Sequence, residues 1–501
     1  MARAELADGF IGLCIDPSNN RQEDPPSLLV EGPMLSGTVA VDADTVIRVN
    51  AERDIEPMFG VGSVLSETLK VMFCAAPDNV TISAIGREAP AGATAAVYNI
   101  AITGTATSDG SFDLYLGDDS YSVAAFVSSG DTAAAIAAKV QAAIPASFPY
   151  AATVTGGTVV LTAKNAGAIG NALSPVYNWT GRLNRAPADV SVAITRATDG
   201  AGAPAALDYD ALVGDCYFDG YVLAFDDQPL ERNLRDYIRD KWDCAKPQSF
   251  GHGYVWGQGS LGTILARDSN SGELSFLAVS ATERAFGWRL AADYGAASIF
   301  RTRENPELSV QGPERGILSC TQVPQSCTAS WSYDDRVALQ AQGFVTYGPA
   351  TQGSGAYTSY YVHNDVTNYR FDETGKVNVT FRDTNSRRLA TRTAIELAAF
   401  AQDYNGEALF TRVTDIPEGV QGTNLRLMKA DMKRWAKARV GSLFSAFTDW
   451  ETQLVMQLDT EINGECKGDP GEVHWTFNYR PPVRLSHINS TLTPSLLGDC
   501  R

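Results

Sequence analysis

The sequence predicts a multidomain protein of mixed α/β and α+β class: a doubly wound α/β core, an inserted β-rich outer domain, and an α+β C-terminal inner domain with extended terminal arms. Apolar strands of the buried type alternate with helices over residues 221–298, which indicates the core. Short alternating strands surround one helix over residues 102–173, which indicates the insert. From about Pro324 antiparallel-type strands precede long helical stretches. The 501 residues leave room for about two to four domains.

Changes of pattern set the expected boundaries. They divide the chain into an N-terminal arm (1–36), a discontinuous core (37–88 plus 198–323), the insert (89–197), a C-terminal inner domain (324–480) and a C-terminal arm (481–501). The first arm is polar and Pro-rich, with one apolar patch from Phe10 to Ile15. Such a segment cannot bury much surface by itself, so it is expected to be disordered or to dock on a neighbour.

The core is expected to begin near Gly37. Its first half is expected to contain strands at 38–41, 45–49 and 80–85, and a helix at 63–73. Its second half is expected to contain strands at 221–225, 253–256 and 275–279. It is also expected to contain a helix at 229–242, which starts at Pro229, and a second helix at 281–298.

The insert is predicted from three signals. Leu114 and Leu116 alternate with polar residues in a strand, and Ile136, Val140 and Ile144 follow the period of a helix capped by Asp131 or Thr132. Gly156-Gly157 separates two strand-like runs, at 153–155 and 158–163, as in a β-hairpin. The stretch contains no His or Cys and few carboxylates, which is typical of a surface module without chemistry.

The C-terminal part is predicted to contain strands at 345–347, 359–362, 376–381 and 473–479, and helices at 385–404 and 425–458. Pro481-Pro482 interrupts the last strand, and a final extended piece covers 483–493.

The charge balance is acidic, with 40 Lys and Arg against 58 Asp and Glu and a net charge of -18. A field of this sign disfavours nucleic acid and anionic membranes as partners. Residues 1–10 lack the apolar core of a signal peptide, and no apolar run reaches the ~18 residues of a membrane span. We therefore expect folding in a cytoplasm.

The eight cysteines are scattered and form no CxxC pair, so neither a zinc site nor a disulfide framework is indicated. Free and mostly buried thiols are expected.

Three further motifs have weak chemical readings. Gly257, Gly259 and Gly262 spell GxGxxG after a strand, but the following residues are expected to form a strand rather than a phosphate-binding helix. The segment 268–273 resembles part of a calcium loop without its distal Glu, which favours a hairpin turn. The four histidines lie in no catalytic or metal motif, so no catalytic residue, cofactor or metal is expected.

One segment contrasts with the acidic chain. Residues 425–439 carry six basic groups against Asp431, and Leu425, Met428, Met432 and Trp435 form an apolar stripe at helical spacing. The basic side is either a solvated helix face or a docking surface for an acidic partner.

Several stretches, in order, resemble the contractile tail sheath proteins of Mu-like bacteriophages. They are PMFGVGSVLSETLKVMF at 57–73, three runs of the insert (GTATSDGSFDLYLGDDSYSV, SSGDTAAAIAAKVQAAI and VVLTAKNAGAIGN), DGYVLAFDD with LRDYIRDKWDCAKPQSFGHGYVWGQGSLGT in the core, and the terminal EVHWTFNYRPPVRLSHINSTL. The resemblance implies a structural, non-enzymatic subunit that polymerises as stacked, hexameric rings around a tail tube. It also implies contraction from a metastable extended state, which drives the tube through the host envelope during genome delivery.

The implied partners are further copies of the chain, the tail tube protein, and baseplate and tail terminator proteins, in a virion tail assembled in the host cytoplasm. Neighbouring subunits are expected to be linked by strands that contain Phe10, Ile11, Leu13, Ile15, Val483, Leu485, His487 and Asn489. The expected tube-facing basic helix contains Arg426, Lys429, Lys433, Arg434 and Lys437.

Two alternatives remain open from the sequence. One is an α/β enzyme with an accessory β domain that binds a nucleotide cofactor at Gly257–Gly262. The other is a different self-assembling lattice protein, such as a surface layer.

Overall fold

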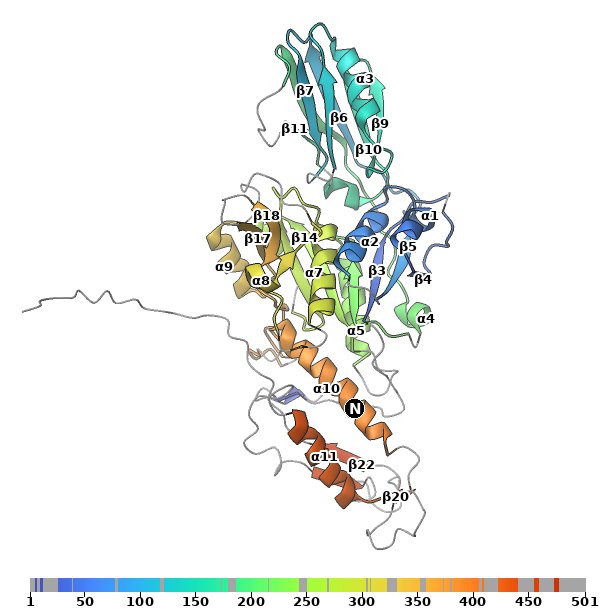
Figure 1. Ribbon diagram of the computed structural model, residues 1–501, viewed down its shortest axis with the longest axis vertical. Coiled ribbons are helices and arrows are strands. Elements are labelled where there is room, and N and C mark those ends of the chain that lie inside the picture. The colour runs from blue at the N-terminus through green and yellow to red at the C-terminus, as the bar shows by residue number, and fades with distance from the viewer. Residues whose placement is uncertain are drawn as a thin grey trace, which may run out of the picture.

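The computed structural model describes residues 5–6, 10–11, 26–404, 408–409, 422–439, 455–458 and 473–476, apart from gaps within 26–404 at 38, 77–79, 118–120, 173, 179–185, 215, 243–249, 268–269, 303–304, 307, 322–330, 352–356, 373 and 379–380. The described parts form an elongated molecule (Figure 1). A central α/β layer separates a β-rich lobe at one end from helices and short strands at the other. The predicted mixed α/β class is confirmed.

The central layer is a six-stranded sheet of order β15-β14-β13-β3-β5-β4. All neighbours pair in parallel except β4, which runs antiparallel to β5 at one edge. The strands are β3 (Ser27–Pro33), β4 (Val46–Val49), β5 (Thr81–Arg87), β13 (Gly220–Leu223), β14 (His252–Gly259) and β15 (Leu274–Ser280).

Successive residues of these strands enter two separate hydrophobic clusters, because side chains alternate between the faces of a sheet. Leu28 and Val30 pack with α2 (Val64–Ala75) and α7 (Gly287–Arg301). Leu29 lies on the opposite face, with α5 (Gln228–Asp240) and α4 (Tyr209–Val213). Both faces are therefore covered by helices, as the predicted doubly wound alternation requires.

The start of the core differs from the sequence prediction. The sequence predicts an arm over residues 1–36, but β3 is one of the two middle strands of the sheet, and Leu28 and Val30 are fully buried. The short run SLLVEGP was obscured by its Pro-rich surroundings. Pro26 and Pro33 lie before the strand and at its last residue, where proline is tolerated.

Two further boundaries were wrong. No strand forms in the described part of 38–41, and the helix expected from residue 281 begins six residues later, at Gly287. The helix expected at 63–73 is α2, and the Ser63 hydroxyl caps it by accepting from Ser66 N. Short helical turns precede α2 at Glu52–Asp54 and in α1 (Ile55–Phe59).

The β-rich lobe contains two antiparallel sheets around one helix. The first sheet has the order β12-β6-β10-β9 and the second β11-β7-β8. Their elements are β6 (Val97–Gly104), β7 (Gly110–Tyr115), β8 (Ser122–Val127), α3 (Ala133–Ala143), β9 (Tyr150–Thr155), β10 (Thr158–Ala163), a 3-10 turn (Ala168–Ala172), β11 (Val176–Tyr177) and β12 (Val190–Thr198). Thr132 caps α3, and Gly156 adopts a positive φ of 59° in the β9–β10 turn, as the hairpin signal predicts.

The lobe is joined to the core by buried polar contacts. Asn165 accepts a hydrogen bond from Val64 N (2.8 Å) and donates one to Met34 O (3.0 Å). Tyr121 donates to the carboxylate of Glu67 in α2 and accepts from Arg289 Nη1 in α7 at 3.0 Å. The same hydrophobic cluster runs from the lobe into the core, so the two parts pack as one body.

Beyond the core, a small sheet of order β16-β18-β17 packs beside α7. Its neighbourhood contains α8 (Gly312–Arg315), β16 (Ile317–Leu318), α9 (Tyr333–Ala341), β17 (Tyr347–Thr351) and β18 (Tyr357–Val362). The described part of the strand expected at 376–381 contains only a single bridge, between Phe371 and Val377. Helix α10 (Thr384–Gln402) then leads to the end opposite the β-rich lobe (Figure 1).

Candidate functional site

Helix α11 (Leu425–Arg439) coincides with the basic segment found in the sequence. Asn424 starts it: its Oδ1 accepts hydrogen bonds from Arg426 N (2.9 Å) and Leu427 N (3.0 Å), which satisfies two unpaired N–H groups of the first turn. The prediction that this helix continues to Leu458 was wrong. Val455–Leu458 is strand β21, which pairs antiparallel with β22 (Val473–Thr476), and so short an apolar run has no periodicity that separates strand from helix.

The predicted apolar stripe of α11 faces the protein. Met428, Met432 and Trp435 are buried, and the ring of Trp435 lies 6.1 Å from that of Phe400 in α10. Tyr404, just beyond α10, donates a hydrogen bond of 2.7 Å to Asp431. These contacts fix which side of α11 remains outward.

The outward side is basic. Arg426, Arg434 and Lys437 are exposed, and Lys429 and Lys433 are partly buried. Arg434 forms an exposed ion pair with Asp431 at 3.2 Å. Exposed charges of this kind bind weakly and are screened by salt. The geometry therefore provides a cationic surface with a defined orientation, at the far end of the molecule from the β-rich lobe (Figure 1).

The strands predicted to link subunits are only partly described. Phe10 and Ile11 form β2, which pairs antiparallel with β1 (Glu5–Leu6). The other predicted linking residues lie outside the described part of the chain: Leu13, Ile15, Val483, Leu485, His487 and Asn489. Another short pair, β19 (Ala408–Leu409) with β20 (Gly422–Thr423), lies before α11.

The glycine-rich loop differs from the prediction in one respect. A short helix, α6 (Leu261–Leu265), follows β14 where a strand was expected, and Ser260 caps it by accepting from Thr263 N at 3.3 Å. The space beside the glycines of the loop is occupied by other side chains of this protein. A Cβ on Gly257 would lie 2.6 Å from the guanidinium of Arg267, and one on Gly259 would lie 3.1 Å from Thr263.

Arg267 is held in this position by acidic partners. It pairs with Asp226, lies 3.4 Å from Glu231, and covers the ring of Phe276 at 5.0 Å. Burial raises the pKa of Glu231 to about 8, and Arg267 offsets only part of this rise. The glycines therefore make room for a buried ion network rather than for a pyrophosphate.

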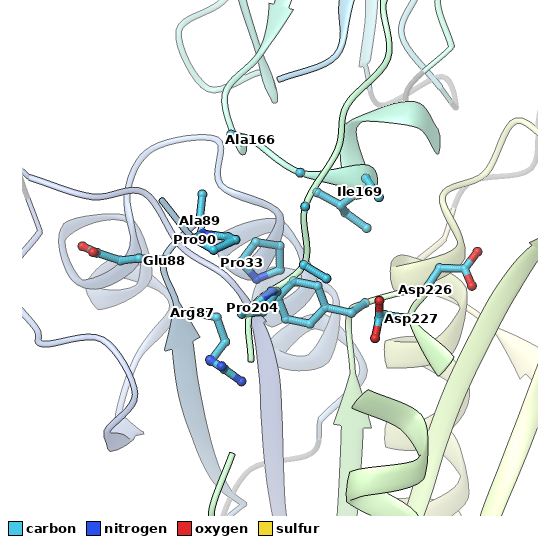
Figure 2. A pocket seen from close by; sticks show the side chains of 15 residues that line it. Pro33, Arg87, Glu88, Ala89, Pro90, Ala166, Ile169, Pro204, Asp226 and Asp227 are labelled. Carbon is cyan, nitrogen blue, oxygen red and sulfur yellow. The ribbon is translucent and has the colours of Figure 1, made fainter. Parts of the chain in front are cut away.

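The usual ligand position of an open α/β sheet is also closed. It lies at the carboxyl ends of the strands, beside the switch in strand order between β3 and β13. Figure 2 shows Pro33, Pro90 and Pro204 lining this position, next to Asp226 and Asp227. The remaining cavity is about 30 Å³, which is room for about one water molecule.

A wider cavity of about 420 Å³ lies between the core and the β-rich lobe. Its polar side chains bond to the chain itself. Glu283 accepts hydrogen bonds from the hydroxyls of Tyr347 (3.0 Å) and Tyr360 (2.7 Å), and Gln258 Nε2 donates to Ser280 O at 3.2 Å. The charged residues Arg196, Asp226 and Arg284 also line this space.

The remaining sequence candidates have structural roles. Asn270, in the expected turn, accepts hydrogen bonds from the backbone N–H groups of Arg370 and Phe371. His252 is buried against Ser275, and desolvation lowers its pKa to about 3, while burial lowers the pKa of His363 to about 4. His474 lies in β22, and His487 is outside the described residues. The described part contains no group of three or more potential metal ligands.

Two features were missed in the sequence. Cys74 and Cys320 form a disulfide, which corrects the expectation of free thiols, although Cys216 is free and exposed. Asp365 and Arg388 form a buried ion pair at 2.7 Å, and it joins α10 to the core. No local sequence pattern predicts either pair, because the two partners of each pair are distant in the sequence and meet only in the folded chain.

A sequence relative supports the family predicted from the sequence. No family model matches the chain. The Mu-like prophage FluMu tail sheath protein of Haemophilus influenzae is 30% identical over 349 residues, which cover 67% of this chain and 69% of that protein.

Similar solved chains come from cryo-EM structures of the anti-feeding prophage. Those of its 6-fold symmetrised baseplate, its contracted baseplate and its contracted helical sheath have TM-scores of 0.44, 0.45 and 0.44 at 9%, 10% and 8% identity. They cover 98%, 99% and 99% of this chain and 98% of each solved chain. These scores are too low to support an argument, so the assignment depends on the sequence relative.

The sequence relative identifies the class of protein, which is a structural component of a phage or prophage tail. The chain belongs to the family of Mu-like prophage tail sheath proteins. The predicted role as a structural tail sheath component is thereby confirmed. Among the described residues, no helix combines the length and apolarity needed to cross a bilayer.

Proposed function

We propose that the protein polymerises as stacked, hexameric rings around a tail tube and contracts from a metastable extended state to drive the tube through a host envelope. The observation that carries this proposal is the sequence identity to a tail sheath protein over two-thirds of the chain. An open helix requires head-to-tail contacts that do not close on themselves, and an elongated subunit with different ends suits such contacts.

The β-rich lobe is proposed to be the outer domain and the α10–α11 end the inner domain. The proposed boundaries are those of the sequence analysis, with β3 moved from the arm to the core. This orientation is supported by the opposite placement of the lobe and α11 (Figure 1). The basic side of α11 then faces the tube, where Arg426, Lys429, Lys433, Arg434 and Lys437 would meet acidic groups. Weak, salt-screened contacts suit a surface that must release the tube on contraction.

Linkage between subunits is proposed to occur through strand addition by the two chain ends. The strand at Phe10–Ile11 and the residues from Val483 onward would each extend a neighbour's sheet, at about 1 kcal/mol net per hydrogen bond. The pair β21–β22 has open edges among the described residues and is a suitable acceptor. Such links would hold the lattice together while other contacts change.

The remaining partners are proposed to be the baseplate and tail terminator proteins. Assembly is proposed to take place in the host cytoplasm, with neither nucleic acid nor a membrane as a direct partner. No catalysis is required, because the energy of contraction is stored during assembly in a bistable lattice.

Charge reversal on α11 tests the proposed tube contact. Lys429→Glu, Lys433→Glu and Arg434→Glu together should reduce the yield of extended sheath on tubes, counted in electron micrographs. The control reverses three exposed basic residues elsewhere, Arg53, Arg315 and Lys376, with the same change of charge. Equal yields from the two triple variants would refute the assignment of α11.

Deletion of residues 483–501 tests the proposed linkage. The truncated chain should keep its circular dichroism spectrum and lose polymerisation in sedimentation. Tubes of normal length from the truncated chain would show that the C-terminal strand does not link subunits.

A further inference from the structure

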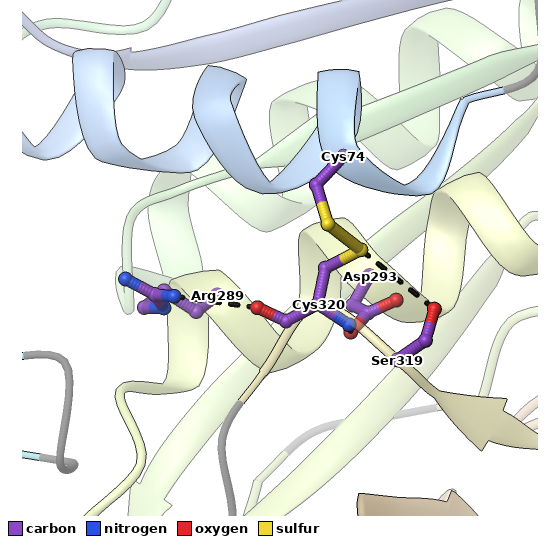
Figure 3. Close-up of a disulfide and its surroundings, with 5 residues drawn as sticks. All are labelled: Cys74, Arg289, Asp293, Ser319 and Cys320. Atoms are coloured by element: carbon purple, nitrogen blue, oxygen red, sulfur yellow. Dashed lines mark hydrogen bonds between the residues drawn. A yellow bond between two sulfur atoms is a disulfide. The ribbon is translucent and has the colours of Figure 1, made fainter.

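Two cysteines that flank the insert in the sequence meet at the surface of the core (Figure 3). Cys74 lies in the last turn of α2, and Cys320 follows β16. They are joined as a disulfide across 246 residues of sequence, with their Cα atoms 5.9 Å apart. The loop that they close contains the β-rich lobe and four of the six strands of the central sheet, β5, β13, β14 and β15.

Helix α7 holds Cys320 in place from both sides of its backbone. Asp293 accepts a hydrogen bond from Cys320 N at 2.8 Å, and Arg289 donates one to Cys320 O at 3.3 Å (Figure 3). Helices α2 and α7 also pack against each other in the same hydrophobic cluster. The two sulfur atoms are therefore brought together by contacts that do not depend on the bond.

The pair is open to small reagents in solution. Cys74 is exposed, and Cys320 is partly exposed. A disulfide in this position can exchange with soluble thiols, whereas a buried one is protected. Cys216 is also exposed but is free, which makes it an internal control.

We propose that Cys74 and Cys320 form a redox-controlled staple of the core, open as two thiols in a reducing cytoplasm and closed by a small-molecule disulfide after release into an oxidising medium. In the closing reaction the Cys74 thiolate attacks one sulfur of oxidised glutathione and releases one glutathione thiolate. The Cys320 thiolate then attacks the Cys74 sulfur of the mixed disulfide and releases the second glutathione. Two protein thiols lose two electrons and two protons, and one glutathione disulfide becomes two thiols.

The staple restricts the unfolded chain more than it changes the folded one, because α2 and α7 are already packed together. Closure therefore raises resistance to unfolding without altering the surfaces that meet other subunits. The time at which the disulfide closes rests on the proposed function, because assembly is proposed to take place in the reducing host cytoplasm. The bond itself is independent of it.

The test uses the purified full-length chain, reduced and then treated with oxidised glutathione. Peptide mass spectrometry should find Cys74 linked to Cys320 in the wild type and in Cys216→Ser, and no such link in Cys74→Ser or Cys320→Ser. The melting temperature of the wild type should rise by about 5 °C on oxidation and fall again with a phosphine reductant. That of Cys74→Ser should not respond.

Glutathione adducts or free thiols at both positions, without the cross-link, would overturn the proposal. A cross-link that leaves the melting temperature unchanged would overturn its stabilising role. Both readings come from the wild type, so they do not depend on how well a variant folds. Cross-linking in a chain that forms no sheath would contradict the proposed function instead, so the two failures are distinguishable.

Discussion

The substitution Arg388→Met tests how the C-terminal end is anchored to the core. Arg388, near the start of α10, donates hydrogen bonds to Asp365 (2.7 Å), to Ser298 Oγ (2.7 Å) and to Leu308 O (2.8 Å). Asp365 is fully buried and also accepts from Tyr294 and from Val310 N. These groups tie α10, which leads to α11, to the central layer.

Methionine fills a similar volume but leaves the Asp365 carboxylate without its cationic partner. Arg388 and the hydrogen bonds together hold the pKa of Asp365 below its usual value despite burial. Removal of one partner from a buried ion pair costs about 3–5 kcal/mol, because the remaining charge stays desolvated. The contribution of this carboxylate is present above the ordinary Asp pKa and is lost as the pH falls through the lower folded value, so the variant should lose least stability in acid.

Urea unfolding of the purified chain at pH 7 measures the effect, with tryptophan fluorescence as the signal. The control is Arg392→Met, one turn further along α10, where the arginine pairs with Glu396 at 2.8 Å and is 32% exposed. A more exposed pair contributes about 1 kcal/mol or less. Equal losses in the two variants, or a loss below about 1 kcal/mol for Arg388→Met, would refute the reasoning.

Two more predictions concern the interior of the core. Asn165→Ala should lower the free energy of unfolding by about 2–4 kcal/mol, because Val64 N–H and Met34 C=O lose their hydrogen bonds in a buried place. The control Asn171→Ala should cost less, because its two hydrogen bonds to Gly200 are partly exposed. Equal losses would contradict the role of Asn165 in joining the lobe to the core. In the folded wild type the Glu231 carboxyl has a pKa of about 8 and keeps a proton that the unfolded chain releases, so stability falls as the pH rises from about 4.5 to 8. Glu231→Gln should therefore flatten the pH dependence of the melting temperature in this window. An unchanged pH profile would show that Glu231 is ionised in the folded protein.

The sequence predicted most successfully where the signal is local. Helix α11 was located at its first residue because its apolar stripe and basic side repeat with the helical period. Pro229 marked the start of α5 to within one residue, and Gly156-Gly157 marked the β9–β10 hairpin, because helix-start and turn residues act within a few positions. Family membership followed from the order of such patterns.

The misses have a common cause, which is dependence on distant parts of the chain. Strand β3 lies in a Pro-rich context and becomes central only when β5 and β13 pair with it. The ion pair of Asp365 and Arg388, like the Cys74–Cys320 disulfide, joins segments whose proximity no spacing rule gives. The subunit contacts proposed for the chain ends would form between copies, so a single chain cannot reveal them.

Electron microscopy of the purified chain, with and without a co-expressed tail tube protein, tests the central claim most directly. The account predicts stacked rings or helical tubes, with an extended, narrow form on the tube and a shorter, wider form after contraction. A monodisperse monomer in every condition, at concentrations and ionic strengths where other sheath subunits assemble, would contradict it.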